Sequence, residues 1–184
     1  MEHQTFEIAG PVLLTPKKFG DERGFFSETY NERVVAPLIG PQKFVQDNQS
    51  LSKPAGTLRG LHFQIDPMGQ GKLVRVTRGA IFDVAVDLRR SSPTFGRHVA
   101  VTLSAENWRQ FWIPVGFAHG FCTLEPDTEV VYKVTEYYAP ECDRGLAFDD
   151  PALGIDWPRP AENYLLSPKD RTHPKLCDLP ACFS

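Results

Sequence analysis

The feature that most constrains the fold of this chain is a two-residue alternation of side chains in its middle third. Residues 80–88 read A-I-F-D-V-A-V-D-L. Successive side chains of a β-strand point to opposite faces, so the pattern predicts a strand with one face on the core. The two alternating sets are Phe82, Val84, Val86 and Leu88 against Ile81, Asp83, Ala85 and Asp87. Residues 72–79, 97–104 and 128–138 are predicted strands on similar patterns.

Turn signals separate these predicted strands at short intervals. Arg78-Gly79 predicts a tight hairpin, so the strands within residues 72–104 are expected to run antiparallel. Residues 30–39 predict one or two helical turns that end at Gly40-Pro41. The last fifth of the chain, rich in proline, predicts an irregular C-terminal tail with short helical turns. Many short strands and almost no amphipathic helix predict an all-β fold, a double-sheet antiparallel sandwich or jelly roll.

Length and charge limit the domain count and the partners. A chain of 184 residues can bury one good core and is short for two, so we expect a single domain over residues 1–184. There is no apolar run of membrane-spanning length, and the N-terminus M-E-H-Q-T-F-E lacks the pattern of a secretory signal. We therefore expect a cytoplasmic protein with no membrane partner. A net charge of -3 argues against a general nucleic-acid binder.

The four cysteines form no C-x-x-C pair and no zinc-type array with histidines. In a reducing cytosol they are expected to be thiols. Cys122 lies near His119 in sequence, which allows a nucleophile, but its apolar setting G-F-C-T-L favours a buried structural thiol.

The stretch T-L-R-G-L-H-F-Q, residues 57–64, is the predicted working centre. It places a cation (Arg59), a titratable base (His62) and an amide (Gln64) among apolar side chains. In a strand His62 and Gln64 share one face, while Leu61 and Phe63 share the other. The imidazole of His62 is therefore expected to point to one defined side of the sheet.

Two segments, G-L-H-F-Q from Gly60 and P-V-G-F-A-H from Pro114, resemble the two halves of the cupin signature. That resemblance implies a cupin-like double-sheet β-barrel. Metal-binding cupins use two histidines and a glutamate from the first half, where this chain has Gln64 and, further on, the uncharged run Met68, Gly69 and Gln70. A zinc or iron site needs imidazoles and a carboxylate there, so we expect no metal.

A longer series of motifs is similar to one family, the dTDP-4-dehydrorhamnose 3,5-epimerases of nucleotide-sugar biosynthesis. The motifs run in order through almost the whole chain, and so many in register are far more specific than any one of them. They are D-E-R-G-F-F from Asp21, V-Q-D-N from Val45, G-T-L-R-G-L-H-F-Q from Gly56, K-L-V-R-V from Lys72, W-I-P-V-G-F-A-H-G-F from Trp112, Y-K-V-T-E-Y-Y from Tyr132, D-D-P-A-L-G-I-D-W-P from Asp149 and S-P-K-D from Ser167.

The resemblance implies epimerisation at C3 and C5 of dTDP-4-dehydro-6-deoxy-D-glucose, by proton abstraction next to the C4 ketone. By this match His62 is the base, Asp170 orients it, and Tyr132 is the acid on the opposite face. Lys72 would meet the negative charge on the C4 oxygen, and His119 would support that oxygen or the sugar hydroxyls. A ketone needs no redox cofactor for this step, which agrees with the lack of a dinucleotide fingerprint.

The same resemblance implies a nucleotide site shared between two subunits. Arginines would bind the diphosphate, Phe26 would stack on thymine, and polar side chains would surround the nucleotide. The residues for these roles are Arg23, Arg59, Phe26, Glu28, Gln46 and Asn48. In the family, the positions of Arg23, Phe26 and Glu28 belong to a segment from the neighbouring subunit, which implies a homodimer.

Two positions near the expected sugar pocket leave the specificity open. Tyr138 falls where the family has its sugar-positioning aromatic, and relatives that act at one carbon differ in this region. Asp143 stands where many relatives carry glutamate, which leaves that contact undecided. A monofunctional 3- or 5-epimerase of another deoxysugar pathway is therefore the first alternative.

Purely structural roles for each of these residues, taken singly, also stay open. His62 can be a satisfied structural histidine, Tyr132 a core residue, Lys72 a solvated strand end, and Asp170 a cap for the turn at Pro168. A cupin that binds a sugar nucleotide without catalysis would fit these interpretations. A metal-dependent cupin oxygenase is a more distant alternative. Because these residues occur together, in the order of the family's motifs, their functional roles are a better interpretation than the structural ones.

Overall fold

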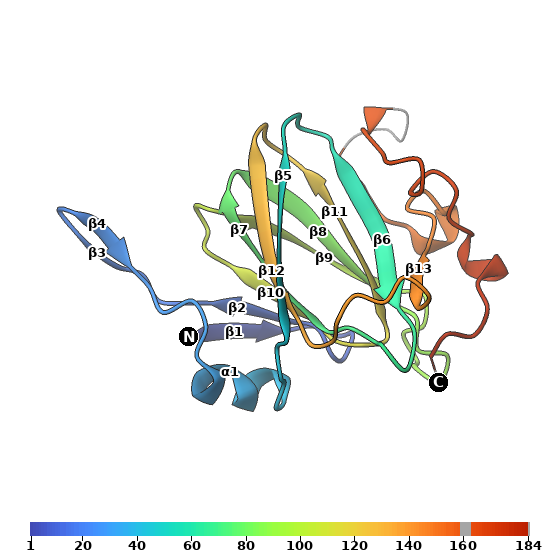
Figure 1. Ribbon diagram of the computed structural model, residues 1–184, viewed down its shortest axis with the longest axis horizontal. Helices are drawn as coiled ribbons and strands as arrows, with labels where there is room; N and C mark the ends of the chain where they lie inside the picture. Colours follow the sequence, from blue (N-terminus) through green and yellow to red (C-terminus); the bar gives the residue numbers. More distant parts are fainter. Residues whose placement is uncertain (159–162, 184) are drawn as a thin grey trace.

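Two antiparallel β-sheets pack face to face in the computed structural model, which describes residues 1–158 and 163–183 (Figure 1). Within these ranges the first sheet has six strands, in the order β1-β2-β10-β7-β12-β5, and the second has five, in the order β13-β6-β11-β8-β9. The predicted all-β, cupin-like jelly roll is confirmed.

The first sheet consists of β1 (Glu2–Thr5), β2 (Val12–Thr15), β10 (Gln110–Ile113), β7 (Lys72–Arg78), β12 (Thr128–Val134) and β5 (Gln46–Ser52). The second consists of β13 (Asp143–Gly145), β6 (Leu58–Gln64), β11 (Phe117–Thr123), β8 (Ala80–Asp87) and β9 (His98–Ser104). The remaining elements are the ribbon of β3 (Phe19–Asp21) and β4 (Gly24–Phe26), the helix α1 (Glu32–Ile39), and the 3-10 turns η1 (Pro151–Leu153) and η3 (Leu176–Asp178).

The core between the sheets takes alternate residues from both of them. Its members include Val74, Phe111 and Val130 from the first sheet and Ile81 and Phe121 from the second. The outer face of the first sheet is covered by α1, whose Val35 packs with Leu14, Leu73 and Trp112. Asn31 caps this helix by accepting from the backbone N–H of Arg33, and Gly40 follows its last residue, as the turn signals predict.

The second sheet is buried on both faces. Every residue of β8 except Phe82 is buried, including Asp83 and Asp87. The prediction that only one face of residues 80–88 lies on a core is therefore wrong. The reason is the C-terminal tail, which lies over the outer face of this sheet and packs Leu146, Leu153 and Leu179 on Leu61, Phe63, Val84 and Val86.

The predicted hairpin at Arg78-Gly79 is also wrong. β7 pairs with β10 and β12 in the first sheet, whereas β8 pairs with β11 and β9 in the second. Gly79, with φ +74, instead carries the chain from one sheet to the other. A sheet change and a hairpin both need a tight turn, so local turn chemistry could not distinguish them. β8 and β9 do pair antiparallel, as expected.

Cys122 and His119 lie on β11 at positions of opposite parity, so their side chains face opposite sides of the sheet. Cys122 is buried with Leu58, Phe148 and Tyr164. The predicted structural thiol is supported, and a pair of Cys122 with His119 is not formed.

A register shift in β6 decides which of its side chains enter the space between the sheets. His62 lies opposite His119 and Arg59 lies opposite Phe121, so three residues of β6 span two of β11. His119 and Phe121 alternate on the inner face, so both Arg59 and His62 also face inward. Simple alternation would have put Arg59 outside.

The shift is centred on Gly60, where the strands approach very closely. Gly60 has φ +131, and an added Cβ atom would overlap the Cα atom of Gly120 on β11. Both the backbone conformation and the contact therefore require glycine.

Among the described residues, no helix is long and apolar enough to cross a membrane.

We expect Gly60→Ala to lower the free energy of unfolding by about 3 kcal/mol or more. The alanine would be strained by the positive φ at this position, and its Cβ atom would overlap the Cα atom of Gly120. Urea unfolding measures the change. Gly24→Ala is the matched control: Gly24 has φ +128, but an added Cβ would meet nothing within 4 Å. Equal losses in the two variants would show that the contact with Gly120 is unimportant.

Candidate functional site

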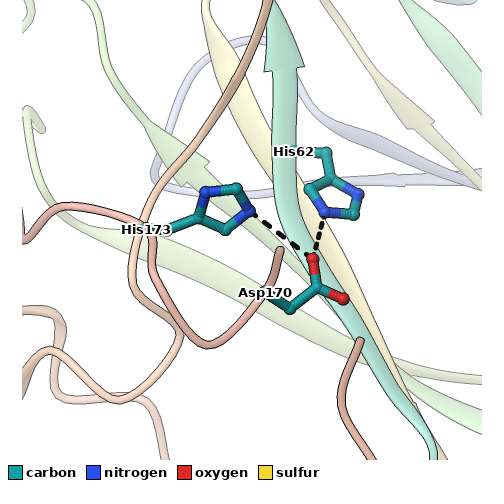
Figure 2. Close-up of side chains that lie close together, drawn as sticks. All are labelled: His62, Asp170 and His173. Atoms are coloured by element: carbon teal, nitrogen blue, oxygen red, sulfur yellow. Dashed lines mark hydrogen bonds and ion pairs between the residues drawn. The ribbon is translucent and has the colours of Figure 1, made fainter. Parts of the chain in front are cut away.

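His62 and Asp170 form a short, partly buried pair. His62 lies on β6 and Asp170 on the C-terminal tail, and His62 Nε2 is 2.5 Å from Asp170 Oδ1 (Figure 2). The Asp170 side chain is 4% exposed, whereas that of His62 is 34% exposed. The backbone N–H of Asp170 donates to Ser167 Oγ, so Ser167 caps the turn and the Asp170 carboxylate remains available to His62.

The electrostatics of this pair fix the histidine tautomer. Burial acts to raise the pKa of the Asp170 carboxyl, but the hydrogen bond and charge of His62 outweigh it and hold that pKa below its ordinary value. An ionised carboxylate can only accept hydrogen bonds. When His62 is neutral, its Nε2 therefore carries the hydrogen, and Nδ1 is left with a lone pair that can accept a proton.

Lys72 places a buried amine beside this pair. Its side chain is on the inner face of β7, and its Nζ donates to the backbone carbonyl of His62 at 3.3 Å. Burial lowers the pKa of Lys72 to about 8, although the carboxylates of Asp143 and Asp83 act to raise it. At pH 7 the amine is still mostly protonated, so it supplies a positive charge of the kind that stabilises an oxyanion.

Tyr132 and Arg59 approach from opposite sheets. Tyr132 is an inward residue of β12, opposite Asn48 on β5 and Val74 on β7. Burial raises the pKa of its phenol, and the charge of Arg59 partly opposes that rise. The phenol therefore stays protonated near neutral pH and can donate a proton. Arg59 Nε donates to Ser52 Oγ of β5 at 3.3 Å, which spans the two sheets.

His119 belongs to a second imidazole–carboxylate pair. Its Nε2 lies 2.6 Å from Asp83 Oδ1, and both side chains are buried. Because His119 lies directly opposite His62, the two histidines are neighbours on the inner face. Asp83 was missed as a site residue in the sequence. Its signal was an acidic residue between apolar neighbours in the middle of a strand.

A polar network at one end of the inner face joins four more predicted residues. Gln46 Nε2 donates to Asn48 Oδ1 at 2.9 Å, and Gln46 Oε1 accepts from the backbone N–H of Tyr138 at 3.3 Å. The Tyr138 hydroxyl donates to Asp143 Oδ2 at 3.2 Å. Asp143 also pairs with Lys169, which sequence reasoning missed although it lies within the S-P-K-D motif.

The predicted residues Arg23, Phe26 and Glu28 are not brought to this site. Arg23 and Phe26 belong to the β3–β4 ribbon and its turn, which projects away from both sheets (Figure 1). The Arg23 side chain is 86% exposed and pairs with Asp21, and Phe26 is 70% exposed. Glu28 accepts from the Asn31 amide just before α1. A shared site was implied by the resemblance, and this separation is consistent with it.

Gln64, which replaces the second cupin histidine, is a structural residue. Its amide donates to the backbone carbonyls of Met68 and Tyr137 and accepts from the N–H of Ala139, at 2.6, 3.0 and 2.8 Å. All the polar atoms of this side chain are thereby bonded to loop backbone.

A cavity of about 370 Å³ is lined by residues that include Tyr30, Arg75 and Lys133, and two of the predicted site residues, Asn48 and Tyr132, also border it. Arg75 and Lys133 occupy the strand positions that alternate with the inward Val74 and Tyr132, so this hollow opens on the outer face of the first sheet. Its size makes it conspicuous, but the histidine–carboxylate pairs lie on the other side of the sheet.

His173 is a further residue that sequence reasoning missed. It lies three residues after Asp170, and its ring centroid is 5.5 Å from that of His62 (Figure 2). The motif that drew attention to this loop, S-P-K-D, ends before His173, and nothing in the sequence pattern linked it to residue 62.

Known proteins resemble this chain over almost its whole length. The profile of a family described as dTDP-4-dehydrorhamnose 3,5-epimerase matches residues 5–178. An enzyme of that name from Sinorhizobium fredii is 55% identical over 183 residues, which cover 100% of this chain and 93% of the relative. A dTDP-4-dehydrorhamnose 3-epimerase from Streptomyces niveus is 39% identical over 165 residues, covering 89% of this chain and 78% of that protein.

Solved structures agree with this result. The crystal structure of a dTDP-6-deoxy-D-glucose-3,5-epimerase from Legionella pneumophila, in complex with dTDP-4-keto-L-rhamnose, has a TM-score of 0.93 and 48% identity to this chain. The match covers 98% of this chain and 95% of the other. At this level of identity and coverage, the two proteins are similar in sequence as well as in fold.

The buried amine of Lys72 predicts a pH-dependent stability. Its pKa falls from 10.5 in the unfolded chain to about 8 in the folded one, so between these values the unfolded state binds more protons and stability rises with pH. We expect Lys72→Met to be more stable than the wild type at pH 7 by about 3 kcal/mol, with the difference shrinking toward pH 10.

Urea unfolding at several pH values measures this difference. Lys72→Arg is the matched control, because its side chain stays charged and its stability relative to Lys72→Met should not change between pH 8 and 10. A constant difference between the wild type and Lys72→Met would contradict the lowered pKa.

Proposed function

The chain belongs to the dTDP-4-dehydrorhamnose 3,5-epimerase family, and from that premise we propose that it inverts C3 and C5 of dTDP-4-dehydro-6-deoxy-D-glucose. The product would be dTDP-4-dehydro-L-rhamnose. The observation that carries the proposal is that His62, paired with Asp170 of the tail, lies on one sheet and the inward phenol of Tyr132 lies on the other. Inversion next to a ketone needs a base on one face of the carbon and an acid on the opposite face.

In this proposal His62 Nδ1 removes the proton from the carbon next to the C4 ketone. Asp170 holds Nε2–H, so the imidazole presents the correct nitrogen and the imidazolium that forms is stabilised by the carboxylate. The 34% exposure of the His62 side chain leaves it accessible, while its partner is nearly buried. No redox cofactor is required, because only protons move.

The charge that develops on the C4 oxygen would be met by Lys72, whose ammonium is buried and already held near His62. Tyr132 would then return a proton from the opposite sheet, and its raised pKa keeps that proton available. His119, fixed by Asp83, would hydrogen-bond the same oxygen or the sugar hydroxyls. Tyr138 and Asp143 would position the sugar at the end of the inner face.

We propose a homodimer in which the β3–β4 ribbon of each subunit completes the site of the other. Arg59, Gln46 and Asn48 would bind the nucleotide from within the subunit. Arg23, Phe26 and Glu28 would come from the neighbour, with Phe26 stacked on thymine. An exposed ribbon with aromatic side chains at 54%, 56% and 70% exposure, those of Phe19, Phe25 and Phe26, supports this arrangement. A cytoplasmic location stays a prediction from the sequence.

Solvent exchange tests the chemistry directly. In deuterated water the wild type should place deuterium at both C3 and C5 of the sugar, as followed by NMR. His62→Asn should slow exchange by about a hundredfold to ten-thousandfold, because the base is lost. Tyr132→Phe should still exchange protons through His62 but should invert much more slowly. His3→Asn, at an exposed position of β1, is the control.

Other results of this experiment separate the alternatives. Exchange and inversion at one carbon alone would identify a monofunctional epimerase. No exchange at either carbon, with normal binding of the sugar nucleotide, would identify a non-catalytic binding protein and overturn the proposal.

Mixing two inactive variants tests the shared site. In the proposed dimer each site takes His62 from one subunit and Arg23 from the other. A mixed dimer of Arg23→Ala and His62→Asn therefore has one site with both residues intact and one site with both residues changed. After unfolding and refolding together in equal amounts, about a quarter of the wild-type activity should return. Each variant refolded alone is the control. An inactive mixture that contains dimers would show that each site is built from one chain.

A further inference from the structure

His173 has no role in the proposed reaction, yet it is held tightly against the base. Its ring packs on Gly145 of β13, where an added Cβ atom would overlap the imidazole. Gly145 lies opposite His62 in the β13–β6 pair. The rings of His62 and His173 meet edge to face, with centroids 5.5 Å apart. The fold therefore fixes a second imidazole beside the first.

The Nε2 atom of His173 is buried and has no hydrogen-bond partner among the described residues. The side chain is 8% exposed, and this nitrogen lies 3.5 Å from Asp170 Oδ1, to which it points (Figure 2). A buried polar atom without a good hydrogen bond is unfavourable. The arrangement leaves His173 Nε2 directed at a point that His62 and Asp170 also face.

The three groups have the geometry of an open metal site. His62 Nε2, Asp170 Oδ1 and His173 Nε2 all lie within 4.8 Å of one another. A zinc ion at about 2.0–2.2 Å from each ligand holds the ligand atoms about 3–3.5 Å apart. His62 Nε2 and His173 Nε2 lie 2.5 and 3.5 Å from the carboxylate oxygen, so a small opening of the His62–Asp170 contact brings both nitrogen–oxygen distances to that spacing. The two nitrogens lie within 4.8 Å of each other.

We propose that His62, Asp170 and His173 bind a divalent transition-metal ion of the zinc type, and that the bound ion inhibits the enzyme. Two imidazoles and a carboxylate are ligands that zinc accepts, and a fourth position would open toward the exposed side of His62. This set shares His62 with the cupin signature but differs from the cupin metal ligands in its other members, since the second cupin position, residue 64, is occupied by a bonded amide.

Inhibition follows from the chemistry of a bound imidazole and rests on the proposed function. Free neutral His62 keeps its hydrogen on Nε2 and accepts the substrate's proton on Nδ1. When the ion takes Nε2, the Nε2 proton leaves to solvent and a solvent proton adds to Nδ1, because a neutral imidazole ligand carries its hydrogen on the other nitrogen. Nδ1 then has no lone pair for the substrate, and Asp170 no longer orients the ring.

Cobalt(II) provides a test of binding that does not depend on activity. The full-length protein, freed of metal with a chelator, is titrated with Co²⁺ and followed by visible absorption, and Zn²⁺ is then added as a competitor. We expect one saturable ligand-field band that Zn²⁺ removes. His173→Ala and His173→Asn should weaken binding by at least about tenfold. His3→Ala, at an exposed histidine, should bind as the wild type does.

Activity is then measured against Zn²⁺ concentration in the same proteins. The wild type should be inhibited in the range where Co²⁺ binds, and the His173 variants should need at least about tenfold more Zn²⁺ for equal inhibition. No cobalt band, or equal binding by wild type and both folded His173 variants, would overturn the site. Binding that leaves an active enzyme uninhibited would overturn the inhibition. A wild type that binds Co²⁺ but lacks epimerase activity would instead refute the proposed function and leave the site intact.

Discussion

The site depends on the close contact between Gly60 and Gly120. The register shift that this contact permits turns both Arg59 and His62 toward the space between the sheets. Without it, strict alternation would put the cation and the base on opposite faces of β6. One backbone irregularity therefore joins the proposed nucleotide anchor to the proposed base, and larger residues at either glycine are incompatible with it.

The interior between the sheets has two parts with opposite physical character. One part is an ordinary apolar core around Val74, Phe111 and Val130. The other contains Lys72, Asp83 and His119, all buried, with one oxygen of Asp83 lacking a hydrogen-bond partner among the described residues. Burying such groups is unfavourable, and the apolar part must offset it. The polar part resembles sites where charges are placed in advance for a reaction.

The sequence allowed the strands, the jelly roll and the His62–Asp170 contact to be predicted, because alternation and family motifs carry that information. It could not distinguish a hairpin at Gly79 from a change of sheet, since both use the same turn chemistry. It also gave no sign that a tail would bury the second face of β8. Asp83 and His173 were missed because their importance comes from neighbours distant in sequence, His119 and His62.

The tail that covers the second sheet also supplies the partner of the base, and this has a consequence for the order in which the protein matures. His62 and Asp170 are separated by 108 positions. During synthesis from the N-terminus, both sheets can leave the ribosome while the imidazole still lacks its carboxylate. Competence for proton transfer thus depends on a segment that is synthesised after the strands of both sheets.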